Sequence, residues 1–303
     1  ARRRAATGVA SLLDGCPLAL LGADQRRELM RALAAGGARL RVVGLPTDGV
    51  PAERLSDPAA AVEMARAVIA PMSGADGQGR LPTPLDPDTR IRLDGRLLSA
   101  IGPKRPLFIG ALPPALAAAA AARGVRVVEL ASVDEIAVAN SVPTAEGAVR
   151  LAMERLPVTI HGSKALVLGF GRCGTTLARL LDAMGADVGV VARRAADRAR
   201  IAAMGLTPWP WSKLAEAVAD RHVIFNTVPA VVLTAAVLAA TREDVLIVDI
   251  ASPPGGTNFE AARRLGRTAM LARGLPGKTA PVTAGRILAA YLPALIRAEL
   301  ERL

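Results

Sequence analysis

The sequence is poor in cysteine, histidine and aromatic residues, and each shortage excludes a class of site. Its 303 residues include two cysteines, two histidines and 2% aromatic residues. Cys16 and Cys173 lie far apart, so we expect neither a disulfide framework nor a zinc site, and this cysteine usage fits a reducing cytosol. With so few aromatic rings, the chain also lacks a stacking platform for single-stranded nucleic acid.

Acidic residues and lysines are also scarce, and the chain carries a formal net charge of +11. Only Lys104, Lys164, Lys213 and Lys278 are lysines, so arginine supplies nearly all of the excess. Apart from residues 1–4, the basic residues are scattered rather than clustered. Together with abundant alanine, this pattern is more typical of a compositional bias than of a nucleic-acid-binding surface. We therefore expect no nucleic-acid partner.

No continuous apolar segment follows the first arginines, so a signal peptide is not expected. Residues 222–241 carry no formal charge and are long enough to span a bilayer. Asn226, Thr227 and Pro229 interrupt that stretch, and a buried strand, a turn and a helix explain it better. We expect no membrane partner.

Short apolar runs alternate with alanine-rich helical segments in both halves of the chain, which indicates parallel sheets built from βαβ units. We predict an α/β fold with two Rossmann-like parallel-sheet domains separated by a cleft. The first would comprise residues 1–139 together with a returning helix at 283–303, and would serve the substrate or a partner. The second would comprise residues 140–282, with a linker helix and the cofactor-binding Rossmann sheet.

The predicted elements follow the same alternation. A linker helix is expected at residues 143–155, with Ser141 as its cap and Pro143 in its first turn. Residues 71–95 are rich in glycine, proline and aspartate and are expected to form loops. The remaining predictions are strands at 18–21, 40–44, 68–70, 107–109, 125–130, 165–168, 188–192, 223–226, 245–250 and 268–271, and helices at 26–35, 114–123 and 175–184.

The most specific motif is Gly169-Phe170-Gly171-Arg172-Cys173-Gly174, which has the form G-x-G-x-x-G. It follows an apolar strand directly and precedes a helix, the context that a dinucleotide-binding fingerprint requires. Gly169 would permit the turn, Gly171 the approach of a pyrophosphate, and Gly174 close packing of helix on strand. A glycine-rich turn without a ligand is the structural alternative.

The end of the second Rossmann strand distinguishes NAD from NADP. Arg193-Arg194 follow this strand, and no carboxylate is available there, since Asp187 lies at its opposite end. Guanidinium groups bind phosphate oxygens in a fork, so the pair favours the 2′-phosphate of NADP, although a chance pair is the alternative in an arginine-rich chain.

Polar residues at the ends of two later strands complete the predicted nicotinamide site. They are Asn226-Thr227-Val228-Pro229 and Ala251-Ser252, the latter after Asp249. Because parallel strands bind ligands at their carboxyl ends, these turns are expected to line the site, with simple turn formation as the alternative.

Several blocks, in this order and spacing, closely resemble the dipicolinate synthase A-subunit family over nearly the whole chain. They are residues 140–148, 159–163, the fingerprint, 226–230, 249–257 and 274–278, with Gly22-Ala23-Asp24 and residues 71–74 in the first half. Asn258, where an aspartate is common, and Cys173, in place of a small polar residue, depart from the family pattern.

The resemblance implies formation of pyridine-2,6-dicarboxylate from the hydroxy-tetrahydrodipicolinate of the lysine pathway, in sporulation, with NADP as hydride acceptor. The resemblance also implies that the partner is the flavoprotein-like B subunit of dipicolinate synthase. It implies a location in the mother-cell cytoplasm, and it leaves homo-oligomerisation open. Backbone amides near Ser73 and the side chain of Lys278 are candidates for binding the two substrate carboxylates.

The catalytic acid or base is not identified by sequence. Ser73, Asn140, Glu146, Lys278 and His161 are candidates by position, and each has an equally good structural role. The linker helix also resembles that of D-2-hydroxyacid dehydrogenases, which use a histidine, whereas His222 here begins a strand at the wrong end of its sheet. A non-catalytic subunit that binds NADP and regulates its partner is a further alternative.

Overall fold

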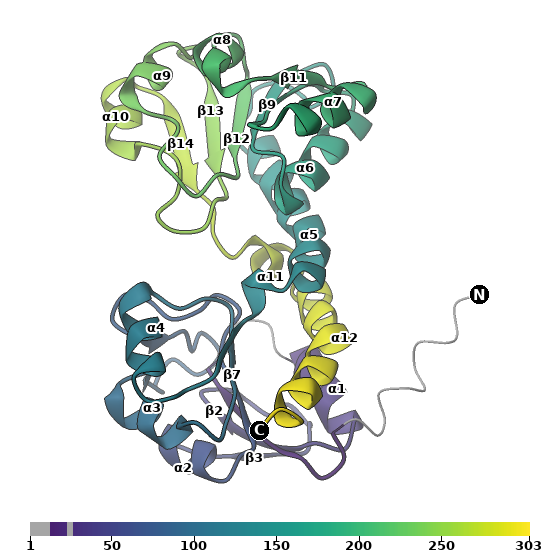
Figure 1. The fold of residues 1–303 in the computed structure, drawn as a ribbon. Helices are drawn as coiled ribbons and strands as arrows, with labels where there is room; N and C mark the ends of the chain where they lie inside the picture. Colours follow the sequence, from purple (N-terminus) through teal and green to yellow (C-terminus); the bar gives the residue numbers. More distant parts are fainter. Residues whose placement is uncertain (1–12, 23–26) are drawn as a thin grey trace, which may run out of the picture. The chain divides into compact units, whose positions relative to one another are not determined.

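The computed structural model describes residues 13–22 and 27–303, and it divides into two compact units. One unit contains the chain up to Ala139 together with Pro281–Leu303, and the other contains Asn140–Ala280 (Figure 1). The arginines at residues 2–4 and the Ala23-Asp24 block lie outside the described residues.

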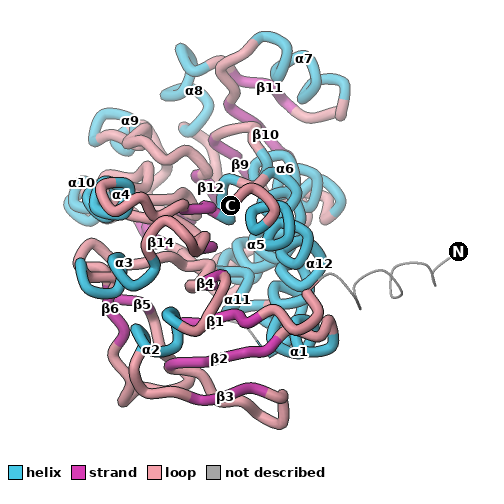
Figure 2. The backbone as a smooth tube through the Cα atoms, turned by 60° about the horizontal axis from the view of Figure 1, so that its bottom comes forward, coloured by secondary structure: helices cyan, strands magenta, loops and turns pink. Residues whose placement is uncertain are grey.

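The first unit is built on a six-stranded parallel sheet (Figure 2). In spatial order its strands are β3 (Ala52–Arg54), β2 (Arg39–Val43), β1 (Pro17–Leu21), β4 (Ala67–Ile69), β7 (Leu107–Ile109) and β8 (Val127–Glu129). Its helices are α1 (Arg27–Ala35), α2 (Pro58–Glu63), α3 (Gly95–Ile101), α4 (Pro114–Ala121), the 3₁₀ turn Leu130–Ser132 and α12 (Pro281–Leu300). Residues 71–95 form the predicted loops, apart from Gly95 in α3 and the short antiparallel pair β5 (Arg80–Leu81) and β6 (Ile91–Arg92).

The last helix returns to this first unit, as predicted. α12 presents Leu288, Leu292 and Ile296 at helical spacing to the core that also holds Leu29 and Leu33 of α1. Near its end, Glu299 is only 7% exposed and binds the guanidinium of Arg126, with a second contact from Arg126 Nη2 to Glu299 Oε1 at 3.1 Å. Hydrophobic packing and one ion pair with a buried carboxylate therefore attach α12 to α1 and to the residue preceding β8.

The second unit has the same strand order on a second six-stranded parallel sheet. Its strands, in spatial order, are β11 (Thr207–Trp209), β10 (Asp187–Val191), β9 (Lys164–Leu168), β12 (Val223–Asn226), β13 (Leu246–Asp249) and β14 (Thr268–Leu271). One face packs against α5 (Asp134–Met153), α6 (Arg172–Ala183) and α7 (Ala195–Ala203), and the other against α8 (Leu214–Val218), α9 (Ala235–Ala239) and α10 (Phe259–Arg264). The 3₁₀ turn Trp211–Lys213 and α11 (Leu275–Thr279) complete the unit. The predicted α/β class with two Rossmann-like parallel sheets is confirmed.

The prediction for the linker helix was wrong at its start. α5 begins at Asp134, so Pro143 lies inside the helix and Ser141 does not cap it. Asp134 and Glu135 in the first turn stabilise the earlier start, since carboxylates favour a helix N-terminus. The Oγ of Ser141 instead lies 2.6 Å from Oγ1 of Thr176 on α6.

The uncharged stretch at residues 222–241 forms β12, a turn and α9, as expected. Within residues 13–22 and 27–303, no helix combines the length and the apolar character needed to cross a membrane.

We predict that Glu299→Gln lowers the free energy of unfolding by about 1–2 kcal/mol, because the carboxylate is buried whereas Arg126 is half-exposed. Hydrogen bonds from Arg126 hold the pKa of Glu299 below its usual value. This contribution is therefore complete above the unfolded-state pKa of about 4.3 and is lost as the pH falls through the lower folded-state value. Urea unfolding at pH 7 and at pH 3 measures the difference.

Glu301→Gln is the control, because Glu301 forms an exposed pair with Arg297. An equal loss of stability in Glu299→Gln at both pH values would contradict the prediction.

Candidate functional site

The turn between β9 and α6 is closely packed at two of its glycines. Gly169 has φ +96°, and a Cβ there would lie 2.5 Å from Thr227 Oγ1. A Cβ on Gly174 would lie 2.2 Å from the carbonyl oxygen of Gly169. Neither position can carry a side chain without movement of its neighbours, so both glycines serve the packing of α6 on β9.

Gly171 differs from the other two glycines, because a Cβ there would meet nothing within 4 Å. It is the N-cap residue of α6, and no side chain caps the helix at this point. The helix N-terminus therefore offers backbone N–H groups and the positive end of its dipole on an open side. β9 and β12 are neighbours at the centre of the strand order, where connections leave in opposite directions, and this is where such sheets bind ligands. These features fit a dinucleotide pyrophosphate.

The turn after β12 is fixed to β9 by hydrogen bonds. Thr227 donates from its N and Oγ1 to the carbonyl oxygen of Leu168, at 3.0 and 2.8 Å. The buried amide of Asn226 bonds to the N and O of Val228. Val228 is half-buried and Pro229 is exposed beside it. The turn is thus held by Asn226 and Thr227 and presents Val228 and Pro229.

Asp249 is the centre of a buried network that the sequence analysis did not include among the site residues. Its two oxygens accept four hydrogen bonds, from Asn226 Nδ2, Ala251 N, Gly256 N and Thr257 Oγ1, at 2.7 to 3.0 Å. The carboxylate has no exposed surface. It therefore joins the turn after β12 to residues 251–257, where Ala251 is buried and Ser252 is exposed. The signals in the sequence were its place at the end of an apolar strand and its place in the block 249–257 that carries the family resemblance.

The two arginines after β10 are placed differently. Arg194 makes a bidentate pair with Asp197, with Nε–Oδ2 at 2.7 Å and Nη2–Oδ1 at 2.8 Å. The exposed side chain of Arg193 has no ion-pair partner among the described residues, whereas its carbonyl oxygen accepts a bond from Arg198. Asp197 corrects the expectation that no carboxylate is available here. It lies in the first turn of α7, but two guanidinium groups already engage it, since Arg200 Nη1 is 3.4 Å away.

A pocket of about 480 Å³ lies beside this ion pair. It is lined by Phe170, Thr175, Arg194, Asp197, Arg200, Ala203 and Met204. Phe170 of the fingerprint and Arg194 of the strand-end pair thus line one pocket, whereas Arg193 does not. Of the remaining fingerprint residues, Arg172 is exposed in the first turn of α6 and Cys173 is partly buried. Burial raises the pKa of the Cys173 thiol, so it is protonated at neutral pH.

The predicted catalytic residues are not brought together as one cluster by either unit alone. Ser73 is exposed in a turn of the first unit, where the N–H of Gly74 already donates to the carbonyl oxygen of Pro71. The Gly74 amide is therefore not free to bind a carboxylate. In the second unit, Lys278 is exposed on α11, and the buried Oδ1 of Asn140 has no hydrogen-bond partner among the described residues.

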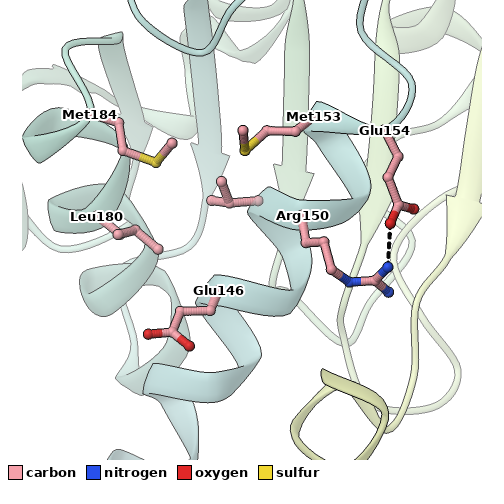
Figure 3. Close-up of a pocket in the computed structure, with 7 residues that line it drawn as sticks. Glu146, Arg150, Met153, Glu154, Leu180 and Met184 are labelled. Carbon is pink, nitrogen blue, oxygen red and sulfur yellow. Dashed lines mark hydrogen bonds and ion pairs between the residues drawn. The ribbon is translucent and has the colours of Figure 1, made fainter. Parts of the chain in front are cut away.

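Glu146 lies in a different pocket, of about 370 Å³, between α5 and α6 (Figure 3). Glu146 and Leu180 both line this pocket, and farther along it Arg150 pairs with Glu154. The fingerprint does not line this pocket.

Both histidines lie at the amino ends of strands, away from the fingerprint. His161 precedes β9 and packs against Gly185, and His222 accepts a bond from the N of Lys164 at 2.9 Å. A histidine at the carboxyl edge, as in D-2-hydroxyacid dehydrogenases, is thus missing from this unit, all of whose residues the structure describes.

We predict that Asp249→Asn destabilises the protein by roughly 1–3 kcal/mol, because an amide cannot accept at both positions and a buried donor loses its acceptor. Hydrogen exchange at the amides of Ala251 and Gly256 should accelerate in the same variant. Asp244→Asn, in an exposed pair with Arg242, is the control, and equal stability of the two variants would argue against the network.

Comparison with known families divides the chain in the same way as the fold. Residues 17–131 match the N-terminal domain of the dipicolinate synthase A subunit, and residues 136–252 match the D-isomer specific 2-hydroxyacid dehydrogenase NAD binding domain. The second match supports a nicotinamide dinucleotide cofactor and an oxidoreductase.

Individual relatives cover nearly the whole chain. The dipicolinate synthase A subunit of Bacillus subtilis (strain 168) is 37% identical over 289 residues, which is 94% of this chain and 97% of that protein. A crystal structure of the dipicolinate synthase A subunit from Bacillus halodurans has TM-score 0.88 and 36% identity, covering 94% of this chain and 98% of that one.

The crystal structure of the Bacillus subtilis dipicolinate synthase A chain has TM-score 0.85 and 37% identity, covering 97% of this chain and 99% of that one. A transhydrogenase from Sinorhizobium meliloti, at 15% identity and TM-score 0.68 over 93% of this chain and 94% of that one, shares the fold alone. On the identity and coverage of its relatives, this chain belongs to the dipicolinate synthase A-subunit family.

Proposed function

We propose that this protein is the NADP-dependent oxidoreductase subunit that forms dipicolinate from the hydroxy-tetrahydrodipicolinate of the lysine pathway, during sporulation. Its partner would be the flavoprotein-like B subunit, in the mother-cell cytoplasm. The observation that carries the proposal is the open, uncapped N-terminus of α6 at Gly171, in a chain of this family. Residues 140–282 would bind the cofactor, and residues 1–139 with 283–303 the substrate or partner.

The residues present fit the cofactor. Gly171 and the first turn of α6 would hold the pyrophosphate, Arg193 and Arg194 the 2′-phosphate, and the turns at residues 226–229 and 251–252 the nicotinamide end. The free side chain of Arg193 and the tethered one of Arg194 support NADP over NAD. Asp197, the carboxylate beside them, is already paired with arginines.

The overall reaction removes one water from the substrate ring and then a hydride and a proton, which leaves an aromatic pyridine with both carboxylates intact. Bound NADP supplies the hydride acceptor. The chain's own residues would bind and orient the dianionic ring, for which Lys278 is the exposed cation on α11. Asn140 offers an unsatisfied buried acceptor, which suits a substrate or cofactor N–H or O–H.

Two other functions are less well supported. A mechanism of the D-2-hydroxyacid dehydrogenase type needs a histidine near the nicotinamide, whereas both histidines lie at the opposite edge of the sheet. A non-catalytic NADP-binding subunit remains compatible with the same cofactor site. Turnover by the purified chain alone, against turnover only with the B subunit, separates catalysis by this chain from regulation of its partner.

We predict that Gly171→Val abolishes dinucleotide binding without unfolding the chain, because the side chain enters open space where the pyrophosphate would lie. Gly77→Val is the matched control, since a Cβ at Gly77 also meets nothing within 4 Å, on a loop of the other unit. Calorimetry with NADP and a thermal melt measure both effects.

The reaction itself is followed in a mixture of this chain, the B subunit, NADP and the enzymatically generated intermediate. With the unmodified chain, the pyridine chromophore and NADPH should appear at the same time. With Gly171→Val, neither should appear. If dipicolinate forms at the same rate without this chain, or with Gly171→Val, this chain is not the hydride-transfer subunit.

We also predict that the unmodified protein binds NADP more tightly than NAD, and that Arg193→Ala reduces NADP affinity about tenfold while NAD affinity stays within about twofold. Arg264→Ala on α10 removes the same charge away from the pocket and controls for the overall positive field. Equal affinities for NADP and NAD in the unmodified protein would refute the choice of cofactor.

A further inference from the structure

Asp197 is a nearly buried acid surrounded by arginines. The residue is 8% exposed, whereas the side chains of its partners Arg194 and Arg200 are 74% and 67% exposed. Its hydrogen bonds with Arg194 lower its pKa, so it is a carboxylate at neutral pH. One fixed negative charge thus holds two solvent-exposed guanidinium groups at the rim of the pocket.

The atoms used in this contact leave a definite part of Arg194 free. Asp197 accepts from Nε and Nη2, along one side of the guanidinium plane. A guanidinium has five N–H donors, so this contact leaves both donors of Nη1 and one of Nη2. Those three donors lie at the end of the side chain, which is the arrangement that binds two phosphate oxygens in parallel.

Arg194 loses little conformational entropy when it binds a phosphate, because Asp197 has already restricted its rotamers. In Arg193 the backbone, rather than the side chain, is held by hydrogen bonding. Arg198 donates to the carbonyl oxygens of both Ala192 and Arg193, at 3.1 and 2.6 Å. The first turn of α7 therefore fixes both strand-end arginines, one by its side chain and one by its main chain.

We propose that Asp197 is a positioning residue that sets the preference for a 2′-phosphorylated cofactor by holding the guanidinium of Arg194 in place. This inference rests on the proposed function for the cofactor only, and not on the substrate. It makes a prediction opposite to that of simple electrostatics. A carboxylate near a phosphate dianion repels it, so removing the charge alone would tighten binding.

The test is Asp197→Asn, with NADP and NAD affinities measured by calorimetry and the fold monitored by circular dichroism and a thermal melt. Asparagine keeps the shape but can accept from Arg194 through one oxygen only. We expect NADP to bind about tenfold more weakly and NAD to bind within about twofold of the unmodified protein. A general loss of structure would instead lower both affinities.

Asp220→Asn is the matched control, because Asp220 also pairs with two cations, Lys164 and Arg242, but beside the amino end of β9. It should leave both affinities unchanged. In an Arg194→Ala background, Asp197→Asn should cost little further affinity for NADP, as expected when the acid acts through that arginine.

Unchanged or tighter NADP binding by Asp197→Asn would overturn the inference and make Asp197 a mere countercharge. The separate fragment 2′,5′-ADP should lose affinity in the same variant, and an unchanged fragment affinity would likewise overturn it. The proposed cofactor choice is tested by a different measurement, since it fails if the unmodified protein binds NADP and NAD with equal affinity. Failure to form dipicolinate leaves these binding results unaffected.

Discussion

The contact between Gly174 and the carbonyl oxygen of Gly169 is the constraint on which the second unit depends. A single added carbon at Gly174 would lie 2.2 Å from that oxygen, so α6 can pack against β9 only without a side chain there. That packing brings the N-terminus of α6 to the centre of the strand order, beside the turn that follows β12. The helix dipole, the open Gly171 and the buried Asp249 network all act at this one edge of the sheet.

Both units use the same strand order, and in both a closely packed glycine directly follows the first strand of the unit. In the first unit, β1 leads to Gly22, and a Cβ there would lie 2.7 Å from the carbonyl oxygen of Pro82. The long segment after β4 thus packs close to the end of β1. Gly169 has the matching position after β9, where a Cβ would lie 2.5 Å from Thr227 Oγ1. In both units the first strand therefore leads into a turn that only glycine fits, with φ +68° at Gly22 and +96° at Gly169.

Sequence reasoning found the strands with apolar runs and the fingerprint, because buried parallel strands have a continuous hydrophobic signal. It missed several elements of nine residues or fewer, among which β3 is largely exposed. These are β3, β5, β6, β11, α2, α3, α7, α8, α10 and α11. It placed the start of α5 at Pro143, because proline is common in the first turn of a helix. In the structure α5 begins at Asp134 and continues past Pro143. The pairing of Arg194 with Asp197 and the four bonds to Asp249 depend on side-chain geometry that spacing alone does not specify.

The return of α12 to the first unit has a consequence for the order in which the chain acquires structure. The second unit is continuous in sequence, from Asn140 to Ala280, so all of its strands are synthesised before α12 begins. The first unit is discontinuous, and its α1 face is covered only when Leu288, Leu292 and Ile296 have emerged. During synthesis, the later-encoded unit can therefore complete its core first, while the apolar face of the earlier one waits for the last residues and is exposed to aggregation in the interval.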